Sequence, residues 1–166
     1  MFNVQCSIPS LMRQVTIFTD GACKGNPGPG GFGVVLKSGK HRLELAKGYS
    51  RTTNNRMELM AAIVGLESLT EPCEVELHSD SRYLIDALTK NWIKGWQAKG
   101  WKTSANQAVK NQDLWQRLTA AAMTHKVTWK WVRGHAGHAE NECCDQLAVA
   151  AATARDLLPD QGFQEK

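Results

Sequence analysis

The sequence of 166 residues has few features of secreted, membrane-spanning or fibrous proteins. It contains no apolar run near the ~20 residues that a transmembrane helix needs. Residues 1–14 have no basic start and no apolar stretch of about seven residues, unlike a secretory signal. Charged residues make up 22% and hydrophobic residues 42% of the chain, which excludes a disordered chain, a coiled coil and collagen. The sequence therefore predicts a globular protein of the cytoplasm.

Cysteines are few and irregularly spaced, so no disulfide framework is expected. The chain has five, an odd number, and without a secretory signal we expect reduced thiols. A zinc site is the alternative for one group: His135, His138, Cys143 and Cys144. It is disfavoured because adjacent cysteines rarely reach one tetrahedral ion without strain.

Charge is distributed unevenly along the chain. The net charge is +4, but residues 82–133 carry ten Lys and Arg against two acids, so this stretch holds +8 and the rest −4. The same stretch contains all six tryptophans. Ammonium groups bind phosphates and flat rings pack on sugars or bases, so this composition suits a nucleic acid. A solvated helical face over a tryptophan-rich core is the alternative, and between Trp92 and Trp115 we favour nucleic-acid contact.

The hydrophobic patterns alternate between strand and helix periods and predict one α/β domain. Strands are expected at residues 15–20, 32–36, 41–49, 74–80 and 127–132, the first three as an antiparallel meander. Helices are expected at residues 54–69, 82–88, 113–123 and 141–152, with Asn54 as the first N-cap. The domain is expected to span residues 15–152, between an N-terminal extension (1–14) and a C-terminal tail (153–166).

Four carboxylates are the candidate site. Asp20 and Asp80 each end an expected strand, and two parallel neighbours would present both at one carboxyl edge. Glu58 lies one turn into an apolar helix, and Asp145 lies in the first turn of the last helix. Singly, each residue is more often a turn or cap residue, or a partner of the helix dipole.

Together these carboxylates favour a metal site. Closely packed carboxylates raise one another's pKa unless a cation neutralises them. Oxygen ligands without imidazole or thiolate select Mg²⁺ or Mn²⁺. Two such ions about 4 Å apart can activate a water and split a phosphodiester. The residues therefore predict a metal-dependent nuclease with a basic, aromatic flank.

Five motifs follow one another along the chain. They are T-D-G-A-C-x-G-N-P-G-P-G-G (19–31), T-N-N-R-M-E-L (53–59), D-S-x-Y (80–83), W-Q-A-K-G-W-K-T (96–103) and G-H-A-G-H-x-E-N-E-x-x-D (134–145). In this order they closely resemble bacterial type 1 ribonuclease H, a family that cleaves the RNA strand of RNA/DNA hybrids. The resemblance covers residues 15–152.

The resemblance implies a ribonuclease H-like fold: a mixed five-stranded sheet, with three antiparallel strands and then two parallel ones, flanked by helices. It implies that Asp20, Glu58, Asp80 and Asp145 hold two Mg²⁺ ions, with Mn²⁺ as a substitute. Hydrolysis would leave a 5′-phosphate and a 3′-hydroxyl. His135, on a loop bounded by Gly134 and Gly137, would assist proton transfer or product release, which suits a side chain that titrates near neutral pH.

The resemblance also implies three groups of substrate-binding residues. RNA hydroxyls in the minor groove would face Cys23, Asn26, Asn54 and Asn55. A phosphate of the DNA strand would bind Arg51, Thr53 and Asn111. A basic protrusion would grip the DNA strand through Trp92, Trp96, Trp101, Lys102 and Lys110. The expected partner is thus an RNA/DNA hybrid. We expect no association with a membrane, and we expect a monomer.

The sequence departs from the family at the protrusion. Gln97 and Ala98 stand where better-charged members carry lysines, and Arg82 stands where a glutamine is familiar. We therefore expect weaker hybrid binding and a shallower salt dependence than in those relatives. Competing hypotheses are a resolvase-like or transposase-like nuclease, a non-catalytic hybrid-binding module and a small-molecule enzyme. The T-N-N-R and G-H-A-G-H elements argue against a resolvase-like or transposase-like nuclease. The intact set of acids argues against a non-catalytic binding module, and no pocket motif supports a small-molecule enzyme.

Overall fold

A computed structural model describes residues 11–165 and places five strands in one sheet, in the order β3-β2-β1-β4-β5. The strands are β1 (Arg13–Cys23), β2 (Gly28–Ser38), β3 (His41–Thr52), β4 (Cys73–Ser79) and β5 (Lys126–Trp131). The helices are α1 (Asn54–Glu67), α2 (Arg82–Thr89), α3 (Trp92–Ala98), α4 (Gln112–Met123) and α5 (Ala139–Ala152).

The sheet is mixed, as expected. β1 pairs antiparallel with β2, which pairs antiparallel with β3. On the other side, β1 pairs parallel with β4, which pairs parallel with β5. The predicted fold is therefore confirmed, and β1 is the central strand that joins the antiparallel half to the parallel half.

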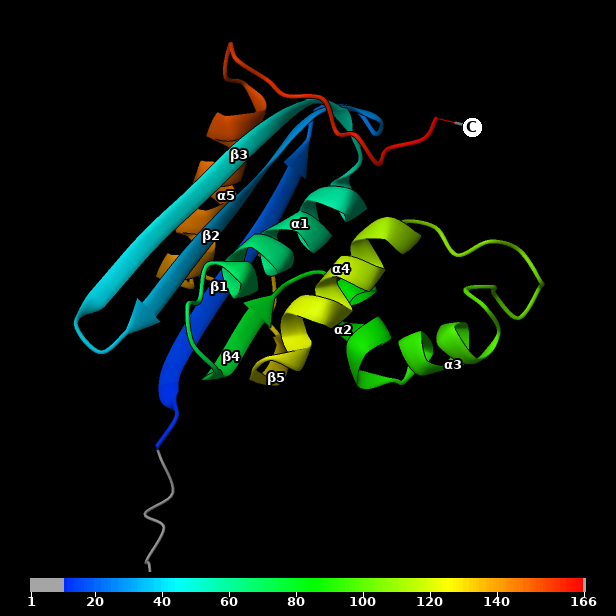
Figure 1. The fold of residues 1–166 in the computed structure, drawn as a ribbon. Coiled ribbons are helices and arrows are strands. Elements are labelled where there is room, and N and C mark those ends of the chain that lie inside the picture. The colour runs from blue at the N-terminus through cyan, green and yellow to red at the C-terminus, as the bar shows by residue number, and fades with distance from the viewer. Residues whose placement is uncertain (1–10, 166) are drawn as a thin grey trace, which may run out of the picture.

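Helices cover both faces of the sheet (Figure 1). α1 packs on β1 and β2, with α4 outside it, whereas α5 crosses β1, β2 and β3 on the opposite face. The core between α1 and the sheet is apolar and closed to solvent, with Ile17, Val34, Leu59, Ile63 and Leu77 all fully buried. Burying such side chains contributes about 1.5–3 kcal/mol each, so this layer holds the strands that carry the site.

The start of α1 differs from the prediction by one residue. Thr53 is the N-cap: its backbone is extended, and its hydroxyl accepts a hydrogen bond of 3.3 Å from the amide of Arg56. Asn54 is the first helical residue, so its prediction as the cap is wrong. The threonine hydroxyl reaches the third amide of the helix first, and this leaves the Asn54 side chain exposed.

The stretch between α2 and α4 forms a projection from the body of the protein (Figure 1). It contains α3, a helix that the sequence patterns did not predict, since seven residues with three apolar positions give little periodicity. After α3 the backbone takes positive φ at Gly100, Trp101, Asn106 and Asn111. These left-handed positions turn the loop back toward α4.

The C-terminal residues pack against the antiparallel half of the sheet (Figure 1). Leu158 bridges Tyr49 of β3, and its carbonyl accepts a 2.8 Å hydrogen bond from the amide of Ser50. Asp160 binds Arg56 of α1 at 2.7 Å. The end of the chain thus braces the junction of β3 and α1.

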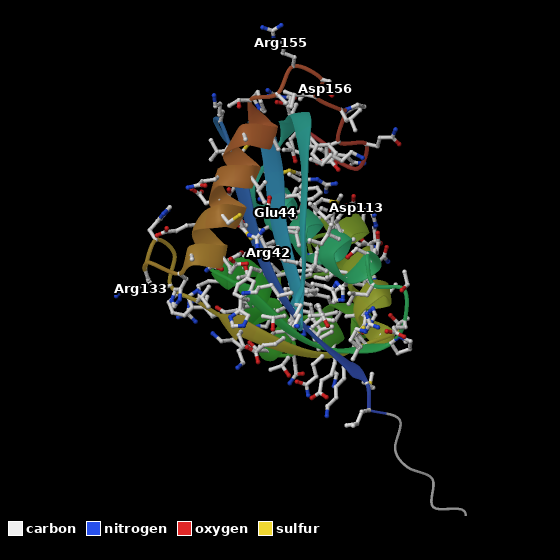
Figure 2. All side chains as sticks on the ribbon, turned by 90° about the vertical axis from the view of Figure 1, so that its left-hand side faces the viewer. Arg42, Glu44, Asp113, Arg133, Arg155 and Asp156 are labelled. Carbon is white, nitrogen blue, oxygen red and sulfur yellow. The ribbon has the colours of Figure 1, made fainter. Side chains whose placement is uncertain are left out.

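Figure 2 looks onto β3, where Arg42 and Glu44 lie beside α5. Arg42 binds Glu140 at 3.2 Å, and Cys143 donates to Glu44 at 3.4 Å. Cys23, Cys73, Cys143 and Cys144 are all free thiols, as predicted, whereas Cys6 lies outside the described residues. Within residues 11–165, no helix is long and apolar enough to cross a membrane.

Candidate active site

Asp20 and Asp80 lie on neighbouring parallel strands, as predicted. Asp80 directly follows β4, but Asp20 lies three residues before the end of β1, so the prediction that Asp20 ends its strand is wrong. β1 extends past Asp20 because it also pairs with β2. Beyond Asp20 the strand continues its antiparallel ladder with β2, up to the pair Cys23–Gly30.

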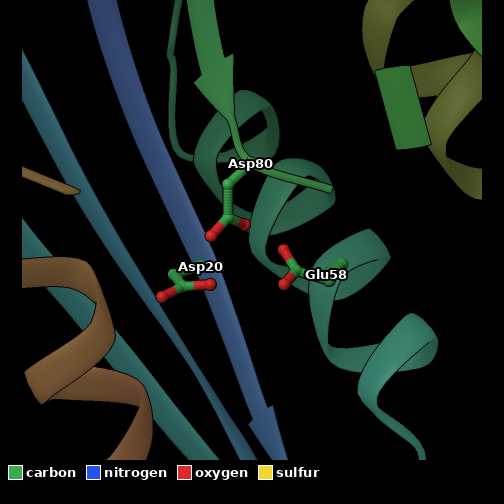
Figure 3. Close-up of side chains that lie close together, drawn as sticks. All are labelled: Asp20, Glu58 and Asp80. Carbon is green, nitrogen blue, oxygen red and sulfur yellow. The ribbon is translucent and has the colours of Figure 1, made fainter. Parts of the chain in front are cut away.

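Glu58 comes close to Asp20 because α1 lies directly against the backbone of β1. A Cβ atom at Gly21 would lie 2.7 Å from the amide nitrogen of Glu58 and 2.9 Å from the Met57 side chain, so a side chain there would push the helix away. Figure 3 shows the result: Asp20, Glu58 and Asp80 point toward one another from β1, α1 and the end of β4. One carboxylate oxygen from each lies within 4.8 Å of the others.

The fourth acid lies on the wall of the same cleft. Asp145 lines it together with Asp20, Asp80 and His135, but it is outside the group of three within 4.8 Å. Asp145 stands in the second turn of α5, not the first as predicted, because α5 begins at Ala139. The first turn includes residues of the G-H-A-G-H-x-E motif, whose two glycines hid the helix start.

The loop before α5 brings His135 to the cleft. A Cβ atom at Gly134 would lie 2.6 Å from the Asp80 carboxylate, so any other residue there would push this carboxylate aside. His135 follows with a φ of 54°, a left-handed conformation that histidine adopts more readily than most side chains. The imidazole therefore enters the cleft beside Asp20, Asp80 and Asp145.

The three clustered carboxyls resist ionisation. Burial and the nearby Asp80 charge raise the pKa of Asp20 to about 7. Burial, followed by the charges of Asp20 and Asp80, raises the pKa of Glu58 well above its ordinary value. Burial also raises the pKa of Asp80. Without a cation, the cluster holds protons that free carboxylates would lose at neutral pH.

These side chains fit a divalent cation. Glu58 is 3% exposed, and its Oε2 atom has no hydrogen-bond partner among residues 11–165. In the described part of the chain no Lys or Arg forms an ion pair with Asp20, Glu58 or Asp80. A buried carboxylate oxygen without a donor, facing two other carboxylates, is suited to a hard cation such as Mg²⁺ or Mn²⁺. In contrast, the alternative zinc residues form no such cluster within the described chain.

The residues expected at the minor groove lie beside the acids. Asn54 and Asn55, both exposed at the start of α1, line the cleft with Glu58. Asn26 lies in the turn between β1 and β2, where its Oδ1 accepts a 3.1 Å hydrogen bond from the Asn54 amide. The thiol of Cys23 donates to the Gly28 and Thr52 carbonyls, both at 3.4 Å, and is half-buried.

The three residues expected to bind a DNA phosphate each have a partner in the protein. Arg51 pairs with Glu165 of the C-terminal tail. Thr53 caps α1. The Asn111 side chain donates to the Tyr83 hydroxyl at 3.1 Å and accepts from the Arg56 guanidinium at 3.3 Å. Asn111 is therefore held firmly, whereas the Arg51 pair is exposed and open to exchange.

The tryptophans of the projection differ in exposure. Trp92 is 41% exposed, whereas the Trp96 ring lies 5.5 Å from that of the fully buried Trp115 and 6.5 Å from that of Trp101. The alternative of core packing holds for Trp96 and Trp101, whereas Trp92 faces solvent and its contact with nucleic acid stays a prediction. Lys102 and Lys110 are exposed.

Sequence reasoning missed two features of the cleft and one of its supporting helix. Arg82 stacks on Trp131, 3.7 Å from the ring centroid, and the Trp131 indole donates to the Asp80 carbonyl at 3.1 Å. Asn141 lines the cleft from α5, four residues before Asp145, a spacing that could have indicated it. The feature of the helix is Arg56, which is buried in α1 and binds Asp113 and Asp160; its position inside an apolar helix was the available signal.

Known proteins share this fold and sequence. A sequence model of the family described as RNase H matches residues 12–153. A protein named Ribonuclease H from Shewanella amazonensis is 60% identical over 155 residues, covering 93% of this chain and 99% of the relative. The solved structure of LC9-RNase H1, a type 1 RNase H with the type 2 active-site motif, is 37% identical with a TM-score of 0.77, covering 85% of this chain and 72% of that one. LC11-RNase H1, solved in complex with an RNA/DNA hybrid, has a TM-score of 0.62 at 23% identity, covering 83% and 96% of the two chains.

Proposed function

The chain belongs to the RNase H family, and we propose that it hydrolyses the RNA strand of an RNA/DNA hybrid in the cleft around Asp20, Glu58 and Asp80. It is an endoribonuclease of that family, which decides against the small-molecule and resolvase-like hypotheses. The observation that carries the location of the site is the mutual approach of these three carboxylates within 4.8 Å, with a buried Glu58 oxygen free to bind a cation.

The proposed ligands of two Mg²⁺ ions are Asp20, Glu58, Asp80 and Asp145, and Mn²⁺ is the proposed substitute. When bound, two such ions activate a water and stabilise the leaving oxygen of a phosphodiester. The products are proposed to be a 5′-phosphate and a 3′-hydroxyl. Asp20, Glu58 and Asp80 supply a rigid set of oxygens, because a strand, a buried helix and a strand end hold them.

His135 is proposed to carry protons to or from the reacting groups, or to assist product release. It lies in the cleft beside Asp80 and Asp145 on a loop with positive φ at His135 and Gly137. Such a loop can change conformation at little cost around its glycines. An imidazole accepts and donates protons near neutral pH, which suits proton transfer at this place.

Selection of a hybrid is proposed to depend on two groups of residues on either side of the start of α1. Asn54 and Asn55, with Cys23 and Asn26, face the RNA hydroxyls that DNA lacks. On the other side, Arg51, Thr53 and Asn111 hold a DNA phosphate. Support comes from their positions: Asn54 and Asn55 line the cleft, and Arg51 already binds a carboxylate, an anion that a phosphate can replace.

The projection is proposed to grip the DNA strand further along. Lys102 and Lys110 offer exposed ammonium groups, and Trp92 offers a half-exposed ring over the packed rings of Trp96 and Trp101. Because Gln97 and Ala98 supply no charge here, we expect a shallower salt dependence of KM than in a fully basic relative. Each phosphate contact changes the slope by about 0.9. A slope as steep as that of a fully basic relative would contradict this expectation.

We further propose that residues 15–152 form the catalytic unit and that the protein acts as a cytoplasmic monomer. Size-exclusion chromatography with light scattering tests the oligomeric state. A dimer at the concentration of the assay would contradict this proposal.

One experiment tests the proposed function. RNA labelled at one end is annealed to DNA or to RNA and incubated with protein in Mg²⁺, Mn²⁺ or EDTA. We expect internal cleavage of the hybrid alone, lost in EDTA and in Asp80→Asn. Asp156→Asn, an exposed acid of the tail, is the matched control and should cleave normally (Figure 2). Hybrid binding without cleavage in either metal would instead favour a binding module.

A further inference from the structure

Asn141 has a buried polar atom with no role in the proposed hydrolysis of the hybrid. It lies in the first turn of α5, and its amide oxygen is buried with no hydrogen-bond donor among residues 11–165. Nearly all buried polar side-chain atoms have a partner in protein or ordered water. Leaving such a group without one costs about 1–3 kcal/mol. This amide therefore needs a partner that is not a described protein atom.

A small cavity lies beside this amide. Its volume is about 10 Å³, close to what one water molecule requires. The residues that line it, all but one with hydrogen-bonding side chains, are Thr19, Asp20, Asp80, Gly134, His135, Asn141, Glu142 and Asp145. A cavity of this size, lined by several hydrogen-bonding side chains, is where an ordered water is expected.

The position of Asn141 does not reflect helix capping. The N-cap of α5 is His138, whose side chain makes no capping hydrogen bond, and the Asn141 side chain lines the cleft instead. Asn141 and Asp145 are four residues apart on the helix and therefore share one face. An amide at this place adds hydrogen bonds without adding charge to a group of acids that already repel one another.

We propose that the Asn141 amide holds one water molecule in this cavity, and that this water positions the His135 imidazole. The water donates one hydrogen to the Asn141 oxygen, and its remaining hydrogen and lone pairs face His135 and the carboxylates. Asn141 is thus a positioning residue that acts through His135, which lines the same cavity. This role rests on the proposed function, in which His135 serves hydrolysis of the hybrid.

A crystal structure of the metal-free protein tests the water itself. We expect an ordered water within about 3.2 Å of the Asn141 oxygen in the wild type. In Asn141→Leu, which keeps a similar volume but has no acceptor, this water should be absent. A dry cavity in the wild type, or an unmoved water in the variant, would overturn the proposal.

Kinetics on the hybrid test the action through His135. Loss of one positioning hydrogen bond of about 1.4 kcal/mol corresponds to about a tenfold fall in kcat, with KM unchanged within about twofold. Combined with His135→Ala, Asn141→Leu should lower kcat less than about twofold further, because groups that act together are not additive. Gln146→Leu, at an exposed amide on the same helix, is the matched control and should leave kcat unchanged.

A full tenfold loss in the His135→Ala background would overturn the role of Asn141, since it would then act independently of the imidazole. If Asn141→Leu does not fold, Asn141→Ala replaces it in the same cycle. Failure of the two proposals is distinguishable. A wild type that cleaves no hybrid would contradict the proposed function, whereas a cleaving wild type with additive losses would contradict only this inference.

Discussion

Two charged side chains on α1 are almost equally buried but have opposite surroundings. Arg56 is 2% exposed and Glu58 is 3% exposed, two residues further along the helix. Arg56 binds Asp113 at 2.8 Å and Asp160 at 2.7 Å. Glu58 instead faces the like charges of Asp20 and Asp80, and one of its oxygens has no partner in the described chain.

The pKa values express this difference. Burial lowers the pKa of Arg56, but hydrogen bonds to Asp113 and Asp160 outweigh it and leave the pKa above its ordinary value, so the group stays charged. Burial and neighbouring acids raise the pKa of Glu58, so its charge is disfavoured. Acids of the chain itself neutralise the charge of Arg56, whereas the charge of Glu58 is left for a bound cation to neutralise. In this protein, buried charge without an internal partner marks the site, and buried charge with partners supports the fold.

The largest effect is expected at Glu58, whose charge has no cationic partner in the described chain. Glu58→Gln keeps the shape of the side chain but removes one ligand, so hybrid cleavage in Mg²⁺ should fall by about 10³-fold or more. Without metal, the variant should be as stable as the wild type or about 1 kcal/mol more stable, because one repelling acid is gone. Cleavage assays and urea unfolding measure the two effects. Activity within about tenfold of the wild type would contradict this assignment.

Arg56→Met is expected to do the reverse of Glu58→Gln: it should lower stability strongly and leave the chemical step nearly unchanged. Removing the guanidinium leaves Asp113 and Asp160 without their cation, so the free energy of unfolding should fall by about 3–5 kcal/mol. The kcat per folded molecule should remain within about threefold, since the acids of the cleft are untouched, whereas KM should rise because Asn111 of the proposed phosphate site loses its hydrogen bond from Arg56. Arg155→Met, an exposed arginine of the tail (Figure 2), is the control and should change stability by less than about 0.5 kcal/mol. Equal losses in both variants would show that the buried pair does not stabilise the fold.

A smaller effect should appear when Mg²⁺ is added at different pH values. The folded pKa of Asp20, about 7, lies above its ordinary value, so its contribution to stability is present at low pH and is lost as pH rises from about 4 to about 7. Mg²⁺ binds the ionised form and competes with the proton. At ten times its Kd, Mg²⁺ stabilises by about 1.4 kcal/mol, or roughly 3–6 °C in Tm, near pH 8, and less than half as much near pH 5. Differential scanning calorimetry measures both shifts, and equal shifts would refute the link.

The smallest effect is expected at Arg51, an exposed arginine that also pairs with the tail. Its partner Glu165 has a side chain that is 56% exposed, and such surface pairs contribute about 0–1 kcal/mol. Glu165→Gln should leave stability unchanged and lower KM for the hybrid by no more than about twofold, because a DNA phosphate no longer competes with a carboxylate. Glu140→Gln, which removes one of the two acids that pair with Arg42, should leave KM unchanged. A raised KM in Glu165→Gln would contradict competition at Arg51.

Much of the fold followed from local patterns. Alternating β-branched residues predicted the strands, and the apolar period predicted α1 because both signals lie within a few neighbouring residues. The features that the sequence did not predict depend on contacts between segments that are far apart in the chain. Asp20 lies inside its strand because β2 extends the ladder, and α3 forms where tryptophans pack on Trp115 rather than where periodicity indicates a helix.

The sequence by itself determined the family, the order of the strands and of every helix except α3, and the chemical identity of the acids, since motifs and periodicity are local properties. Tertiary structure alone decided which charges have partners. Arg56 is neutralised by Asp113 and Asp160, which lie 57 and 104 residues away along the chain, whereas Glu58 meets further acids. It also decided that Asn141 and His135 share a small cavity. Neither fact is encoded in spacing, because burial and pairing arise only when strands and helices close around one another.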